Sequence, residues 1–171
     1  MVGLGVTTGP APTPGARPAD RAAPSPGPAS TSAASDTDQV EQLRGELPPP
    51  VQRRSGQKMH GRWVGPDGTA HAIVSGHDDV LTPRVNNVLR EAGCPMLPAS
   101  TAADVELKLA VLMRDSGIRH AIVVTNNTPC QGPLGCDTLL PVVLPEGYAL
   151  TVYGPNNYRR TFRGGAEPWW R

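Results

Sequence analysis

Two cysteines in a short loop could hold a metal ion. Cys130 and Cys136 flank the residues Gln-Gly-Pro-Leu-Gly and follow an unbroken apolar run that ends near Thr125. Thiolates are preferred zinc ligands, and a catalytic zinc site uses three protein ligands and keeps a fourth position open. The five intervening residues exceed the usual two. On this feature alone, two ordinary loop thiols are an equally good interpretation.

Two carboxylates stand one residue apart at the start of an expected helix. Asp104 and Glu106 lie in the first turn of the segment 103–116, which is rich in good helix formers. Such groups can bind a metal or carry protons. The alternative is structural, because acidic residues complement a helix N-terminus and Thr101 with Asp104 fits a capping box. Taken singly, the pattern favours the structural role.

Apolar spacing and turn residues predict the elements that must position these groups. The run Ala121–Val124 predicts a strand covered on both faces, and the four-residue link after Tyr153 is too short for a parallel crossover. We therefore expect a three-layer α/β/α fold whose mixed five-stranded sheet ends in an antiparallel hairpin. The expected strands are 61–64, 69–75, 118–125, 148–153 and 158–163, and the expected helices are 78–92, 103–116 and a short one near 137 with Pro141 in its first turn.

The first part of the chain has a different composition from the rest. Ten of the 20 prolines lie between Pro10 and Pro50, among Ala, Ser, Thr and Gly. Such a segment buries too little apolar surface to offset the entropy of ordering it. The composition predicts a disordered linker over residues 1–55, with a weak helical patch at 36–47, and one folded domain over residues 56–171.

Charge and hydropathy exclude several classes of protein. Sixteen basic and fifteen acidic residues nearly cancel, so any nucleic-acid contact must be local. No apolar stretch approaches the ~20 residues that span a bilayer, and the first ten residues lack the pattern of an export signal. We expect a soluble chain as given.

Three cysteines argue against a disulfide framework, and Cys94 is interpreted as an incidental thiol. The local basic candidates, interleaved with aromatic residues, are Arg159, Arg160, Arg163 and Arg171.

Together, the carboxylates and the cysteines resemble the zinc nucleobase deaminase superfamily. There a His-x-Glu opens one helix and a Pro-Cys-x-x-Cys opens the next. More narrowly, residues 104–155 resemble the DddA-type bacterial deaminase toxins through Asp-Val-Glu, the pair Asn126-Asn127, the cysteine loop and Leu-Leu-Pro before Tyr-Gly-Pro. A looser resemblance covers residues 56–171. This chain has Asp104 where the commonest pattern has His, and its cysteine spacing is longer.

The resemblance implies a cytidine-deaminase-like fold and a role for each candidate residue. Cys130 and Cys136 would ligate Zn²⁺, and Glu106 would move a proton from the activated water to the pyrimidine and then to the leaving ammonia. Asp104, two residues before Glu106, is our candidate for the third ligand. The candidate substrate contacts are Asn126, Asn127, Arg159 and Arg160.

The expected activity is conversion of cytosine to uracil in DNA. Few aromatic residues and a near-zero net charge favour single-stranded DNA, with double-stranded DNA as the other candidate, because opening a duplex costs a few kcal/mol. The resemblance implies a toxin domain, secreted as part of a larger protein and acting in the cytoplasm of a target cell, with an immunity protein as partner. We expect a monomer. Two alternatives are an inactive deaminase-fold domain that binds nucleic acid or protein, and an RNA or nucleoside deaminase.

Overall fold

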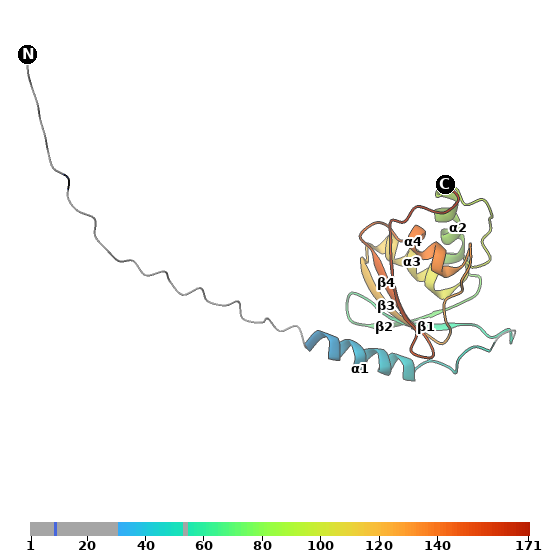
Figure 1. Cartoon of the computed structure of the whole chain (residues 1–171). Coiled ribbons are helices and arrows are strands. Elements are labelled where there is room, and N and C mark those ends of the chain that lie inside the picture. Colours follow the sequence, from blue (N-terminus) through green and yellow to red (C-terminus); the bar gives the residue numbers. More distant parts are fainter. Residues whose placement is uncertain (1–8, 10–30, 53–54) are drawn as a thin grey trace, which may run out of the picture.

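The computed structural model describes residue 9, residues 31–52 and residues 55–171 (Figure 1). Within that part of the chain, four helices and five strands alternate in the order helix, two strands, two helices, strand, helix, two strands. The helices are α1 (Thr31–Gly45), α2 (Leu81–Glu91), α3 (Val105–Ser116) and α4 (Cys136–Val143), and the strands are β1 (His60–Val64), β2 (Ala70–Val74), β3 (His120–Thr125), β4 (Ala149–Tyr153) and β5 (Arg159–Arg163).

The five strands form one mixed sheet with the order β2-β1-β3-β4-β5. Strand β1 is antiparallel to both β2 and β3, whereas β3 and β4 are parallel. Strands β4 and β5 pair antiparallel, with Tyr153 opposite Arg159. The predicted mixed sheet and its C-terminal antiparallel hairpin are confirmed.

Helices α2, α3 and α4 cover one face of the sheet (Figure 1). Strand β3 sends the buried side chains of Ala121 and Val123 into the main core on this face. Helix α3 is buried along most of its length, as its composition predicts. It packs so closely on β1 that a Cβ at Gly61 would lie 2.8 Å from Cγ1 of Val105. This close packing fixes the first turn of α3 against the sheet.

Helix α1 covers the opposite face and completes the third layer (Figure 1). Its buried residues Val40 and Leu43 pack against Val124, which points away from the main core. This corrects the prediction that residues 1–55 are a linker, because the ordered and packed part of the chain begins before residue 56. The prediction for residues 1–8 and 10–30 lies outside the described residues.

The other predicted elements differ from the structure mainly in their ends, with one exception. Pro141 is the sixth residue of α4, so its expected place in the first turn is wrong. Pro141 cannot donate to the carbonyl of Asp137, and α4 ends two residues later, at Val143. Among the described residues, no helix is long and apolar enough to cross a membrane.

Candidate metal centre

Asp104 directs its carboxylate away from the helix that it precedes. It stands at the N-cap of α3 with extended backbone dihedrals, yet its side chain makes no capping hydrogen bond. Its Oδ2 instead lies 3.3 Å from Sγ of Cys130 and 3.3 Å from Sγ of Cys136. The hydroxyl of Thr101 donates to the carbonyl of Leu134, so the capping-box alternative is wrong. Asp104, which stands at the N-cap position, therefore contacts the two cysteines instead of capping the helix.

The cysteine loop closes on itself despite its five intervening residues. The backbone N–H of Cys136 donates to Sγ of Cys130 at 3.2 Å, and the N–H of Asp137 donates to the carbonyl of Cys130. The loop needs glycine at position 135, because a Cβ there would come within 2.5 Å of the carbonyl carbon of Gln131. The longer spacing is therefore compatible with thiols that meet at one point.

The ligand atoms of Asp104, Cys130 and Cys136 all lie within 4.8 Å of one another. Two thiols and one carboxylate oxygen, contributed by the start of α3, the loop after β3 and the start of α4, form a set of three donors. That number and these atom types suit a zinc ion with one open position. These three residues could hold a metal ion.

Glu106 lies beside this cluster and is completely buried. Its Oε2 is 3.8 Å from Sγ of Cys136, while its Oε1 has no hydrogen-bond partner. Burial raises the pKa of Glu106 to about 7, and the negative charge of Asp104 acts in the same direction. A buried carboxyl group with one free oxygen can hold or release a proton near neutral pH.

The cluster collects acidic groups and no positive charge. Burial raises the pKa of Asp104. The hydrogen bond with Cys130, burial and the carboxylates of Glu106 and Asp104 raise the pKa of Cys136 well above its usual value. Within the described part of the chain, no Lys or Arg forms an ion pair with these groups. A bound cation is the natural complement to such a donor set, so the residues fit a metal ion.

Cys130 borders an open groove of about 710 Å³. The groove is lined by the loop after β3, including Asn127 and Gln131, and by Val51 from the segment between α1 and β1. The sequence did not predict a role for Val51, because the three prolines before it placed it in the expected linker. A single valine after a run of prolines carries no signal of a binding site, so only its tertiary contacts reveal this position.

Asn126 is buried and both polar ends of its side chain bind backbone. Its Oδ1 accepts the N–H of His60 at 2.7 Å, and its Nδ2 donates to the carbonyl of Pro49 at 3.1 Å. These bonds join the end of β3 to the start of β1 and to the segment after α1. The structure thus uses the predicted substrate contact as a structural tie. One N–H of the amide and one lone pair of its oxygen remain for a further contact.

The remaining predicted contacts lie at the same end of the sheet as the cluster. Arg159 opposes Tyr153, which opposes Val124 near the end of β3, and its guanidinium lies 5.5 Å from the centre of the Tyr153 ring. Arg160 is exposed and lies over the ring of Phe162. Asn127 is the only one of the four predicted contacts that lines the groove at Cys130.

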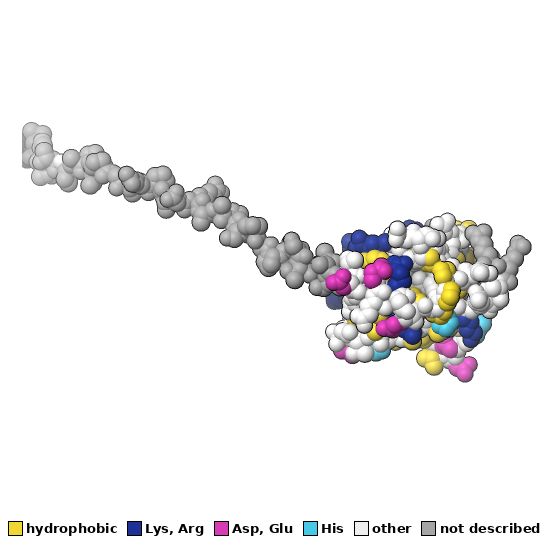
Figure 2. Space-filling view, turned by 90° about the horizontal axis from the view of Figure 1, so that it is seen from below, with side chains coloured by type: hydrophobic (Ala, Val, Ile, Leu, Met, Phe, Trp, Pro, Cys, Tyr) yellow, Lys and Arg dark blue, Asp and Glu magenta, His cyan; other side chains and the backbone are white. Residues whose placement is uncertain are grey.

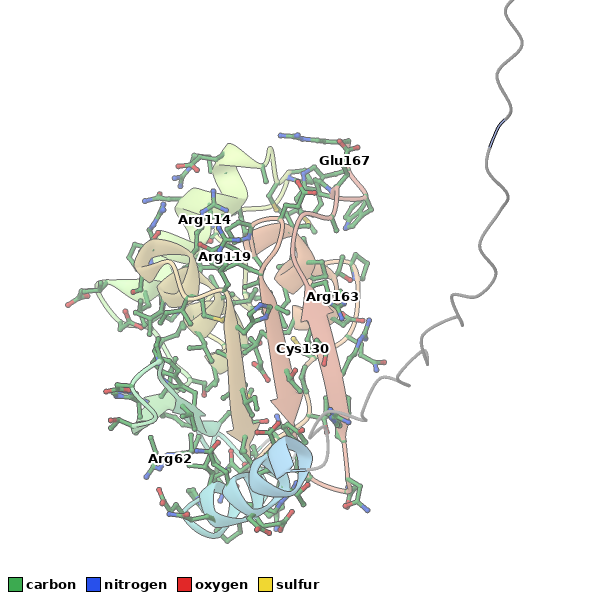
Figure 3. All side chains as sticks on the ribbon, turned by 90° about the vertical axis from the view of Figure 1, so that its left-hand side faces the viewer. Arg62, Arg114, Arg119, Cys130, Arg163 and Glu167 are labelled. Carbon is green, nitrogen blue, oxygen red and sulfur yellow. The ribbon has the colours of Figure 1, made fainter. Side chains whose placement is uncertain are left out.

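The surface carries mixed charges. On the face seen in Figure 2, basic side chains are interspersed with acidic ones. Arg163 points outward from β5, whereas Arg62 lies beside α1 (Figure 3) and pairs with Glu46 at 3.1 Å. On the face shown in Figure 2, therefore, neither sign of charge dominates among the described residues.

The C-terminal tryptophans hold the end of the chain against the domain. Nε1 of Trp170 donates to the carbonyl of Ala92 at 3.0 Å, next to the end of α2. Nε1 of Trp169 donates to the carbonyl of Pro133 in the cysteine loop at 2.7 Å. These two hydrogen bonds attach the C-terminal segment to the end of α2 and to the loop that carries the thiols.

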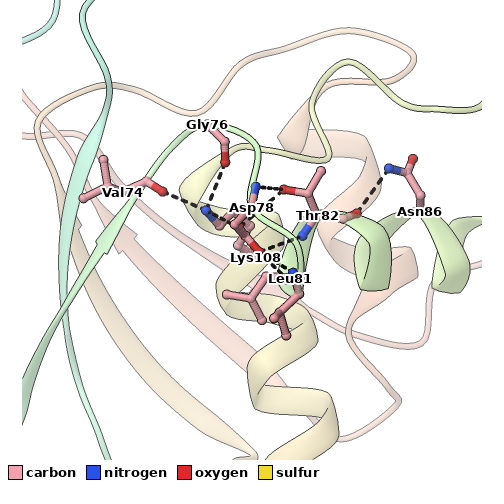
Figure 4. Close-up of polar contacts among 8 residues, drawn as sticks. Val74, Gly76, Asp78, Leu81, Thr82, Asn86 and Lys108 are labelled. Atoms are coloured by element: carbon pink, nitrogen blue, oxygen red, sulfur yellow. Dashed lines mark hydrogen bonds and ion pairs between the residues drawn. The ribbon is translucent and has the colours of Figure 1, made fainter.

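A second buried polar cluster lies on α3 one turn after Asp104 (Figure 4). The ammonium of Lys108 pairs with Asp78 at 2.7 Å and donates to the carbonyls of Val74 and Gly76. Asp78 also accepts the backbone N–H groups of Val80 and Leu81 at the start of α2. This cluster ties β2, α2 and α3 together.

The fold and the donor set define a deaminase-like α/β domain. Residues 26–168 match the family model described as SCP1.201-like deaminase. Because this match covers more than half of the chain, the protein belongs to the SCP1.201-like deaminase family. The search of curated proteins finds no match. The family assignment agrees with the expected fold and with a metal site at Asp104, Cys130 and Cys136.

Proposed function

We propose that this protein is a zinc-dependent deaminase that converts cytosine to uracil in DNA. The observation that carries the proposal is the orientation of Asp104, whose carboxylate faces both thiols and leaves its own helix uncapped. A purely structural N-cap residue would bind the free N–H groups of the helix. The buried Glu106 beside the cluster supplies a group for proton transfer.

Each residue has a defined task in this proposal. Asp104, Cys130 and Cys136 would hold the zinc ion, which when bound lowers the pKa of its water towards ~7. Glu106 takes one proton from the attacking water on its unpartnered Oε1 and delivers it to N3 of cytosine. It then takes the remaining proton of that water, from the new hydroxyl at C4, and passes it to the departing amino group, so that the C4 carbonyl forms as ammonia leaves. Cytosine and water thereby give uracil and ammonia.

The groove at Cys130 and the overall charge bear on which form of DNA the protein uses. The open groove at Cys130 has room for an extruded or unpaired base, and the chain's 16 basic residues are nearly cancelled by 15 acidic ones, which disfavours broad binding of a duplex backbone. We therefore propose single-stranded DNA as the preferred substrate and double-stranded DNA as a second one. The resemblance to DddA-type toxins supports a toxin domain of a larger secreted protein, monomeric and controlled by an immunity protein.

One observation favours a different function. Asp104 replaces the His of the commonest deaminase pattern, and a carboxylate ligand adds negative charge and makes the centre a weaker Lewis acid. A domain that has lost activity in this way would keep the fold and bind nucleic acid or a protein. The buried Glu106 argues for catalysis, because an uncompensated buried carboxyl group is costly to retain without a use.

The deciding experiment measures uracil formation. The zinc-loaded protein and its Glu106→Gln variant are incubated with cytosine-containing single-stranded DNA, duplex DNA, RNA and free cytidine. Uracil from the parent but not from the variant establishes the deaminase, and the best substrate identifies its class. No uracil from any substrate, with the parent folded and loaded with zinc, would favour the binding domain.

A further inference from the structure

The segment Leu47–Val51, which we call the proline strap, crosses the end of β3. Figure 1 shows the chain leaving α1 and running along the lower edge of the molecule before it enters β1. The N–H of Val51 donates to the carbonyl of Asn126 at 3.1 Å, and the side chain of Asn126 holds the carbonyl of Pro49. Leu47 packs against the core under α1, and Val51 packs against the main core. Both ends of the strap are thus fixed.

The middle of the strap is exposed although its ends are anchored. The rings of Pro48, Pro49 and Pro50 all face solvent. Three consecutive prolines fix φ and lack N–H groups, so the middle of the strap is stiff, and its backbone donors are the N–H groups of Leu47 and Val51 at its two ends. Exposed, rigid apolar rings next to a candidate active site form a surface for binding rather than for internal packing.

The strap forms a shared wall of three adjoining hollows. Val51 borders the groove of about 710 Å³ that contains Cys130. Pro48 and Pro49 line two further hollows, of about 350 Å³ and about 330 Å³. Each volume lies within the roughly 300–1,000 Å³ that is usual for ligand sites. Asn126 lines both of the smaller hollows and ties them to the end of β3.

The smaller hollows combine apolar walls with positive charge. Lys58 lines the first and Arg44 the second. Arg44 is engaged with Glu41 and with the carbonyl of Gly154, whereas Lys58 forms no ion pair among the described residues. Apolar side chains, proline included, can lie against the faces of nucleobases, and an ammonium group binds phosphate. These features fit the nucleotides on either side of an unpaired base.

We infer that the proline strap binds the nucleotides that flank the target cytosine and thereby sets the preferred sequence context. The inference rests on the proposed function, since it places the target base in the groove at Cys130 and its neighbours in the two smaller hollows. A substrate that fills all three is a single-stranded polynucleotide. A free nucleoside would occupy only the groove at Cys130.

Variants of the strap test this inference through the neighbours of the edited cytosine. The double variant Pro48→Ala, Pro49→Ala keeps the carbonyl that Asn126 holds but removes two rings. The control variant is Pro66→Ala. Pro66 is an exposed proline in the turn between β1 and β2, at the opposite end of the sheet. Each protein deaminates a single-stranded library with random bases beside one cytosine, and sequencing gives the rate for every context.

We expect the double variant to flatten the context preference and to raise the KM for an oligonucleotide about fivefold, which corresponds to one weak stacking contact. The rate on free deoxycytidine should not change, and Pro66→Ala should match the parent. Lys58→Gln should raise the same KM and weaken its dependence on salt. An unchanged context profile and KM in both strap and lysine variants would overturn the inference.

A binding measurement separates this inference from the proposed function. Fluorescence anisotropy of a labelled single-stranded oligonucleotide reports affinity without any chemistry, and thermal unfolding shows that each variant is folded. If the parent forms no uracil and the strap variants bind the oligonucleotide more weakly than the parent, the strap binds single-stranded DNA, but the deaminase proposal fails and the role in sequence context fails with it. If the strap variants bind as tightly as the parent, the inference fails whatever the activity. If uracil forms and the strap variants match the parent in affinity and context preference, the deaminase proposal stands and the strap inference fails.

Discussion

Helix α3 carries two buried polar clusters that differ in how completely they are satisfied. Around Lys108, which is 6% exposed, one ammonium meets one carboxylate and two carbonyls, so positive and negative charge balance (Figure 4). Around Glu106, which is 0% exposed, acidic groups converge without a positive partner among the described residues, and one carboxyl oxygen stays unpaired. The two clusters begin within two residues of each other on the same helix.

This difference separates a structural role from a chemical one. Burying an unpaired charge is expensive, and proteins retain such groups mainly at functional sites. The Lys108 cluster needs nothing more to stabilise the fold. The Glu106 cluster becomes favourable when a cation joins Asp104 and the two thiols. Substitutions in the first cluster should therefore change stability, and those in the second should change metal binding and catalysis.

The largest expected effect is the loss of catalysis in Glu106→Gln. Removing a general acid and base typically costs about 10²–10⁴-fold in rate, so uracil formation by the zinc-loaded protein should fall by at least about 100-fold. Zinc content and the midpoint of thermal unfolding should stay close to those of the parent. Activity within a few-fold of the parent would remove Glu106 from the mechanism and would make its burial a structural feature.

The next effect concerns zinc. Asp104→Ala should reduce the zinc content of the purified protein from stoichiometric to substoichiometric, because two thiols alone give an incomplete site. Asp104→His, which restores the commonest deaminase pattern, should retain stoichiometric zinc. Metal analysis by mass spectrometry, alongside circular dichroism to verify folding, decides the matter. Stoichiometric zinc in Asp104→Ala would show that this carboxylate is not a ligand.

Lys108→Met should change stability instead of chemistry. Breaking a buried ion pair costs about 3–5 kcal/mol, but Asp78 is 33% exposed and solvent screens the charge that is left behind. We therefore expect the free energy of unfolding in urea to fall by about 2 kcal/mol. Zinc content should be unchanged. If Lys108→Met loses zinc while remaining equally stable, the two clusters are not separate in the way that their contacts indicate.

The smallest effect is a pH dependence of stability from Asp78. Burial alone raises the pKa of this group, but hydrogen bonds from Lys108 and from the N–H groups of Leu81 and Val80 outweigh it and lower the pKa from 3.8 to about 2. A lowered pKa in the folded state means that the stabilisation is complete above the unfolded value and disappears as the pH falls from about 4 through about 2.

After screening, this contribution amounts to about 1 kcal/mol. Urea unfolding at pH 5 and at pH 2.5 should therefore show a larger loss of stability for the parent than for Asp78→Asn. The Asn variant starts less stable and has no carboxyl group to protonate at this position. Equal losses for both proteins would contradict the lowered pKa.

The alternation of apolar residues was sufficient to predict most of the fold. The hairpins and the buried strand follow from local patterns that extend over whole elements. The sequence predicted a weak helical patch at 36–47, most of which lies in α1, but not that this helix packs on the sheet, because Val40 and Leu43 stand in a segment of low overall hydropathy. Val40 and Leu43 become core residues because the side chain of Val124 projects from the outer face of β3 and packs against them. The composition of a segment does not determine whether its side chains are buried, because burial depends on the surface that the segment packs against.

The sequence alone determined which groups could do chemistry here: two carboxylates spaced by one residue and two cysteines spaced by five. Tertiary structure decided what these groups do, because Asp104 meets the thiols only when α3 and the cysteine loop lie side by side. It also gave Asn126 a structural role, as a tie that holds the strap. Residue type limits the chemistry that a group can perform, but its partners come from distant parts of the chain, and only folding brings them within hydrogen-bond distance.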